Sequence, residues 1–150
     1  MNKTGERRTR PDHSVGANGA GRELALWPLW AALGVLGLGL LVFLSLTPLP
    51  HHVLHFTFGD KLEHIAAFAC VQAWFSQLYV SRRRRLILLL VFMVVALALE
   101  LGQRLIGGYP ELEWGDVLAS WCGLLLAAWA MTNGRADGFL RKLESKFLVR

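Results

Sequence analysis

Ionisable and hydrogen-bonding side chains interrupt the long apolar stretches of this 150-residue chain at a few positions. A charged group at the centre of a membrane-spanning helix costs about 2.5–3.5 kcal/mol on insertion scales, so these positions are informative. Asp60 and His64 stand one helical turn apart, an arrangement in which a carboxylate can orient an imidazole for proton transfer. The candidate catalytic residues are Asp60, His64, Glu100 and Asp116, and the candidate substrate-binding residues are Lys61, Gln103, Arg104 and Ser120.

These candidate residues are expected at one depth in a membrane. Asp60 and Lys61 precede an inward-running apolar stretch, and Asp116 opens another. Glu100 ends an outward-running stretch, about 21 Å beyond Leu86 at 1.5 Å per helical residue. In a compact helical bundle, the polar groups of three helices would therefore face one another in the outer leaflet.

Two other interpretations of the same residues stay open. Asp60 with His64, and Glu100 with Arg104, have the i,i+4 spacing of ion pairs that would only lock a bundle together. Asp60, His64, Glu100 and Asp116 also have the chemistry of metal ligands, but they lack a diagnostic spacing such as His-Glu-x-x-His. The sequence thus predicts no metal and no cofactor, and the loop histidines His51, His52 and His55 are expected to be solvated.

The composition indicates that an all-α polytopic membrane protein positions these groups. The chain is 54% hydrophobic and only 18% charged, with a mean hydropathy of +0.40, whereas a soluble domain carries about a quarter charged residues. Apolar stretches long enough to cross a bilayer predict four helices in a compact bundle, at about 24–46, 62–80, 86–106 and 116–132. The first is too long for a cleaved signal peptide and lacks a cleavage pattern.

The flanking segments and their positive charges predict how the chain is oriented in the membrane. Residues 1–23 are expected to form a flexible basic tail, 24–132 the membrane domain, and 133–150 a basic amphipathic tail. Fourteen of the 16 Lys and Arg residues lie in these tails or in the run Arg82–Arg85, all on one side of a four-span path. The positive-inside rule then places both termini in the cytoplasm. The basic excess therefore reflects topology rather than affinity for nucleic acid, although Arg82–Arg85 could also bind anionic lipid.

Two further patterns concern packing. Ala119, Gly123 and Ala127 form a row of small residues that permits close helix approach, to another helix of this chain or to a membrane protein partner. In the C-terminal tail, Phe139, Leu140, Leu143 and Phe147 recur at helical spacing, which predicts an amphipathic helix on the inner leaflet; a partly disordered tail is the alternative.

Three short motifs at the ends of these spans resemble the VanZ-like family of small membrane proteins. They read Asp60-Lys61-Leu62-Glu63-His64, Glu100-Leu101-Gly102-Gln103, and Asp116 with Ser120 and Gly123; Leu46-Thr47-Pro48-Leu49-Pro50 and Glu113-Trp114-Gly115-Asp116 also look like the family. The likeness covers roughly residues 27–132. The chain departs from the family at Pro110, where an arginine is usual nearby, and at Ser120, where asparagine is usual.

The resemblance implies a cell-envelope protein, from a family named after a protein of glycopeptide-resistance clusters. The leading hypothesis is binding of a lipid or lipid-linked head group at the outer-leaflet polar groups, with membrane lipids and anionic or lipid-linked envelope precursors as partners. A hydrolase or transferase acting on a lipid-linked phosphate or acyl group is the second hypothesis. A non-catalytic helper of a membrane complex, bound through Ala119, Gly123 and Ala127, is the third.

Overall fold

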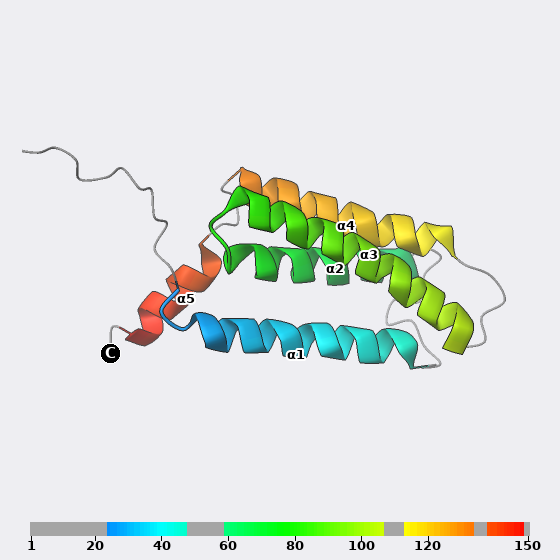
Figure 1. The fold of residues 1–150 in the computed structure, drawn as a ribbon, viewed down its shortest axis with the longest axis horizontal. Coiled ribbons are helices and arrows are strands. Elements are labelled where there is room, and N and C mark those ends of the chain that lie inside the picture. Colours follow the sequence, from blue (N-terminus) through cyan, green and yellow to red (C-terminus); the bar gives the residue numbers. More distant parts are fainter. Residues whose placement is uncertain (1–23, 48–58, 107–112, 134–137, 149–150) are drawn as a thin grey trace, which may run out of the picture.

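The computed structural model describes residues 24–47, 59–106, 113–133 and 138–148, which form five helices and no strand. The helices are α1 (Trp27–Leu46), α2 (Gly59–Gln77), α3 (Arg82–Ile106), α4 (Trp114–Thr132) and α5 (Phe139–Leu148). Helices α1 to α4 lie alongside one another, and α5 crosses one end of them (Figure 1). The expected flexible tail 1–23, the loop histidines and Pro110 lie outside the described residues.

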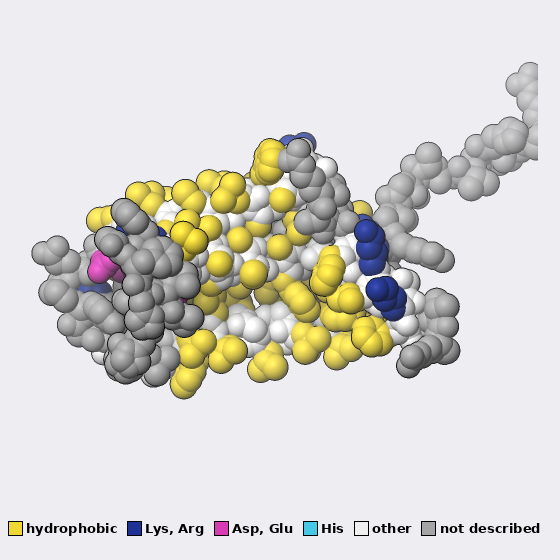
Figure 2. All heavy atoms as spheres, turned by 180° about the vertical axis from the view of Figure 1, so that it is seen from behind, with side chains coloured by type: hydrophobic (Ala, Val, Ile, Leu, Met, Phe, Trp, Pro, Cys, Tyr) yellow, Lys and Arg dark blue, Asp and Glu magenta, His cyan; other side chains and the backbone are white. Residues whose placement is uncertain are grey.

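Three of the helices, α1, α3 and α4, are long and apolar enough to cross a membrane. The 20 residues of α1 reach about 30 Å, which matches the hydrocarbon thickness of a bilayer. Apolar side chains cover the middle of the molecule, and charged side chains gather toward its two ends (Figure 2). Length, composition and surface together are those of a membrane protein.

Helix α2 is more polar than the others, and the bundle covers its polar groups. It packs against α1, α3 and α4, most extensively against α4. Gln72 and Ser76 are each only 1% exposed, and the Gln72 amide donates a hydrogen bond of 3.0 Å to the Ser76 hydroxyl. Burial against protein explains why a helix with this many polar residues is compatible with apolar surroundings.

The helix boundaries differ most from the sequence prediction at α3. The helix begins at Arg82, four residues before the expected position, so the arginine run is helical rather than a loop. Long arginine side chains can extend along the helix to polar surroundings while their backbone stays helical. Arg85 is fixed by a 2.7 Å hydrogen bond from its Nε to the carbonyl oxygen of Tyr79 in the α2–α3 turn.

Helices α4 and α2 approach each other closely at Gly123. A Cβ atom added at Gly123 would overlap the carbonyl oxygen of Ile65 and lie 2.9 Å from its carbonyl carbon. Ala119 and Ala127, one turn before and after, are also buried. Helix α2 of the same chain therefore covers the small-residue row that the sequence offers to a partner.

Helix α5 docks against the bundle end where α1 begins. Leu140 is fully buried in a cluster with Leu24, Trp30 and Leu78, while Phe139 and Phe147 on α5 are exposed. The backbone N–H of Leu140 also donates a 2.9 Å hydrogen bond to the Gln77 side chain. Part of the apolar face predicted to lie on lipid thus packs on protein.

The Glu144 carboxylate joins α5 to the start of α1. It accepts hydrogen bonds from the backbone N–H groups of Ala25 (3.0 Å) and Leu26 (2.6 Å) and from the Trp30 indole (3.3 Å). Burial alone would raise the pKa of Glu144, but these hydrogen bonds together outweigh it, so the pKa is lowered from its ordinary value of 4.5. The carboxylate also lies where the positive end of the α1 dipole favours an anion.

Substituting Glu144 by glutamine is expected to loosen α5. Loss of an anionic cap costs about 1–2 kcal/mol, so the amides of residues 139–148 should exchange hydrogen about 5–30 times faster. Because the folded pKa is lowered, the stabilisation is present above pH 4.5 and is lost as the pH falls through the folded pKa. Hydrogen exchange in wild-type α5 should therefore become faster in acid, whereas exchange in Glu144→Gln, corrected for the intrinsic rate, should change little. Lys146→Gln is the control at an exposed position of the same helix. Equal exchange rates in Glu144→Gln and Lys146→Gln would contradict this role of Glu144.

Candidate functional site

Six of the eight predicted site residues gather at the bundle end opposite α5. They come from the start of α2, the end of α3 and the start of α4, three elements that meet there because α3 runs antiparallel to the other two (Figure 1). We call them the polar cluster: Asp60, Lys61, His64, Glu100, Asp116 and Ser120.

An ion pair joins α2 to α4 within the cluster. The Lys61 ammonium donates a hydrogen bond of 2.9 Å to Asp116, whose side chain is 7% exposed against 39% for Lys61. Gly115 gives the lysine room, since a Cβ there would lie 2.9 Å from its Cε. Asp116 also stands in the first turn of α4, where the helix dipole favours a negative charge.

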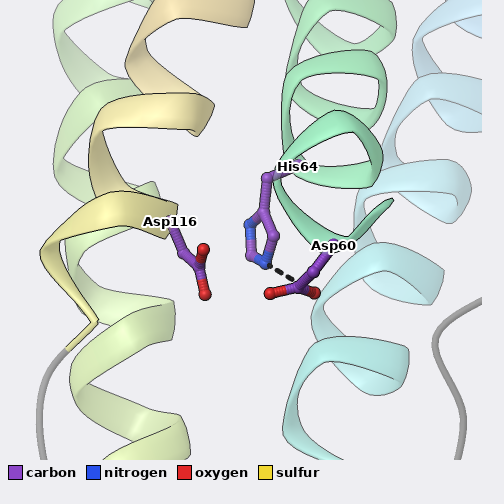
Figure 3. A group of neighbouring side chains, drawn as sticks. All are labelled: Asp60, His64 and Asp116. Carbon is purple, nitrogen blue, oxygen red and sulfur yellow. Dashed lines mark ion pairs between the residues drawn. The ribbon is translucent and has the colours of Figure 1, made fainter. Parts of the chain in front are cut away.

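The imidazole of His64 lies between the carboxylates of Asp60 and Asp116 (Figure 3). Its Nε2 is 3.9 Å from the Asp60 carboxylate, and its Nδ1 is 3.2 Å from the Ser120 hydroxyl on α4. The Ser120 hydroxyl is within hydrogen-bond distance of the ring, and the Asp60 carboxylate is at ion-pair distance from it. The arrangement can transfer a proton or hold a ligand at the Asp60 side, where the groups are partly exposed.

Glu100 brings the end of α3 into the cluster. It is 6% exposed and accepts a 3.1 Å hydrogen bond from the backbone N–H of Glu113, the residue before α4. It interacts electrostatically with His64 and Asp116. The expected pair with Arg104 does not form, so this carboxylate stays part of the acidic surroundings of His64.

Two predicted site residues make no contact with the cluster in the described structure. Gln103 donates a 2.9 Å hydrogen bond to the carbonyl oxygen of Ser45, which ties α3 to α1. Arg104 is exposed on the last turn of α3. Both therefore lie near the cluster along the helix but point elsewhere.

Glu113, which the sequence analysis did not select, is a further member of the site's surroundings. Its carboxylate lies 3.9 Å from the Lys61 ammonium. The negative charge of Asp116 raises the pKa of Glu113, and burial and a hydrogen bond to Asp116 act in the same direction. The sequence feature that could have identified Glu113 is its position three residues before Asp116, at the start of a predicted helix. Four carboxylates (Asp60, Glu100, Glu113 and Asp116) thus surround one lysine and one histidine.

The excess of negative charge decides which groups the site can hold. Carboxylates accept hydrogen bonds from ammonium and hydroxyl groups, and they repel phosphate. Ligand atoms of Asp60, His64 and Asp116 lie within 4.8 Å of one another, so these three could also hold a metal ion. Asp116 already has the Lys61 ammonium as its cation, which a metal would have to displace.

An apolar groove lies between α1 and α2. It has a volume of about 410 Å³ and includes Gly34, Gly37, Ala67 and Val71 in its lining. Ala67 follows His64 by one helical turn. Gly37 faces open space, so α1 does not close on α2 there. A hydrocarbon chain fits such a groove.

Comparison with known proteins adds no relative: no family model, curated protein or solved structure matches the chain. The resemblance to the VanZ-like family therefore remains a prediction from the sequence motifs.

Proposed function

We propose that the chain is a four-span, VanZ-like protein of the bacterial inner membrane with both termini in the cytoplasm. In this topology α2 also crosses the membrane, together with the three apolar helices α1, α3 and α4. The proposal is supported by the position of α2 alongside the three apolar helices, and by the run Arg82–Arg85 and α5 at the same bundle end (Figure 1). The polar cluster then lies in the outer leaflet.

Its function is to bind the head group of a lipid or lipid-linked envelope precursor at the polar cluster. The observation that carries this proposal is the acidic cluster with a partly exposed edge, one helical turn from an apolar groove. A polar site and an apolar groove on the same helix, one turn apart, suit a molecule with a head group and a chain. A structural lock needs neither the open edge nor the groove.

The acidic surroundings narrow the class of head group. Since four carboxylates outnumber Lys61, the ligand should present ammonium or hydroxyl donors, as aminoalkyl and sugar head groups do. A phosphate on the same molecule would lie toward the Lys61 ammonium, which is 2.9 Å from Asp116 and 3.9 Å from Glu113.

Replacing Asp60 by asparagine tests this function. The purified protein is titrated with phosphatidylethanolamine, which carries an ammonium, and with phosphatidylglycerol, which carries hydroxyls, and bound lipid is counted by native mass spectrometry. Loss of a charge-assisted hydrogen bond of about 1.5–3 kcal/mol should lower occupancy of the preferred lipid about tenfold or more.

Glu63→Gln is the matched control, because it removes the same charge on the same helix from a residue outside the cluster. Unchanged occupancy in Asp60→Asn, or equal loss in both variants, would contradict the proposal. Loss of binding on addition of a chelator would instead assign the site to a metal ion.

A hydrolase or transferase is the second candidate, because one observation favours it. The His64 imidazole lies 3.2 Å from the Ser120 hydroxyl, within the hydrogen-bond distance that general-base activation of a serine requires, and 3.9 Å from the Asp60 carboxylate, which would have to approach to orient the ring. Ser120 is however only 2% exposed, so a substrate would have to part α2 from α4 to reach it. Labelling by a fluorophosphonate that is lost in Ser120→Ala and kept in Ser76→Ala would establish this activity over simple binding.

A further inference from the structure

A second cavity lies at the opposite end of the molecule from the polar cluster. It has a volume of about 310 Å³ and is bounded by the start of α1, the α2–α3 turn, the start of α3 and α5. Arg84, Arg85 and Arg141 contribute to its lining. Guanidinium groups from two helices that are far apart in sequence therefore meet around one space.

Contacts between the lining residues hold the walls of this cavity in place. Arg85 donates to the Tyr79 carbonyl oxygen, and the Arg84 guanidinium lies 5.9 Å from the centre of the Tyr79 ring. Trp27 packs edge-on against the same ring at 6.3 Å and donates a 3.2 Å hydrogen bond to the carbonyl oxygen of Leu78. The cavity is thus built by directed contacts between α1, the turn and α3.

We propose that this cavity binds the phosphate of an anionic phospholipid. Arginine guanidinium groups match phosphate in both charge and hydrogen-bond geometry. The other walls include Leu24, Leu78 and Val80, which suit the glycerol and first methylenes of a lipid. Trp27 and Tyr79 also line the cavity, and these residue types are enriched where membrane proteins meet lipid head groups.

This site is independent of the polar cluster and has the opposite charge. The polar cluster binds hydrogen-bond donors of a ligand through its carboxylates, whereas the cavity binds phosphate through its arginines. Arg82 and Arg83 belong to the same basic run but do not line the cavity, so the chain itself supplies the controls that separate a site from general surface charge.

The test measures phosphatidic acid bound to the full chain by native mass spectrometry, because its head group has the phosphate but no ammonium or hydroxyl donor for the polar cluster; phosphatidylcholine is the neutral comparison. Arg84→Gln and Arg141→Gln should each lower phosphatidic acid occupancy about tenfold, whereas Arg82→Gln and Arg83→Gln should change it less than about twofold. Arg84 is exposed, so its variant keeps the test valid if Arg141→Gln fails to fold.

Three outcomes would overturn the proposal. Equal loss of lipid occupancy in all four arginine variants would assign the effect to general surface charge. Unchanged lipid occupancy in Arg84→Gln would show that the cavity does not bind the lipid. Displacement of the lipid by inorganic phosphate, with phosphate retained, would make the ligand a free anion. Asp60→Asn should leave this binding unchanged, so failure here and failure of the proposed head-group function are distinguishable.

Discussion

Gly123→Ala is expected to destabilise the protein by about 3 kcal/mol, at the upper end of the range for overpacking a core. The added methyl group would overlap the Ile65 carbonyl oxygen, which belongs to the backbone of α2 and cannot rotate away. Helices α2 and α4 must therefore move apart, which disturbs the pairs Lys61–Asp116 and His64–Ser120. Denaturant titration in mixed micelles measures the loss.

Gly37→Ala is the matched control for this prediction. Gly37 also lies within an apolar helix, but a Cβ there would meet no atom within 4 Å. Its replacement should leave stability unchanged or raise it by up to about 1 kcal/mol through helix propensity. Similar losses in both variants would show that the α2–α4 contact does not determine stability.

Lys61→Met is expected to cost about 2–3 kcal/mol, somewhat less than the 3–5 kcal/mol typical of a broken buried pair, since the Lys61 side chain is 39% exposed. The cost arises because the variant leaves Asp116 buried without its cation. Denaturant titration in mixed micelles measures this loss of stability.

The double variant Lys61→Met with Asp116→Asn should recover most of that stability. It removes both charges and leaves no uncompensated carboxylate at Asp116. A double variant as unstable as Lys61→Met alone would mean that the pair contributes by packing rather than by charge.

Much of the helical architecture is predictable from the sequence, because apolar length alone marks α1, α3 and α4. The boundaries are less predictable. The start of α3 was placed four residues late because an arginine run resembles a loop in composition, while its backbone remains helical. Docking of α5 was also missed, since the carboxylate of Glu144 reaches the start of α1 only through tertiary contact.

The polar cluster shows where sequence reasoning succeeds and where it ends. The position of a residue along the bundle follows from counting residues along its helix. This is why the sequence predicts that Asp60, Glu100 and Asp116 lie together at one end of the bundle. The rotation of each helix does not follow from counting, and so Gln103 was assigned to the site although it bonds to Ser45 on α1. The groove between α1 and α2 depends on how two helices pack, and no single residue predicts it.

The most direct test of head-group binding at the polar cluster is lipid occupancy of the double variant Lys61→Met with Asp116→Asn. Native mass spectrometry would count bound phosphatidylethanolamine and phosphatidylglycerol on this variant and on the wild type, after denaturant titration has established that both are folded. The proposed function predicts a folded double variant that has lost the preferred lipid about tenfold or more. A folded double variant with wild-type lipid occupancy would contradict it and would make the cluster a structural lock.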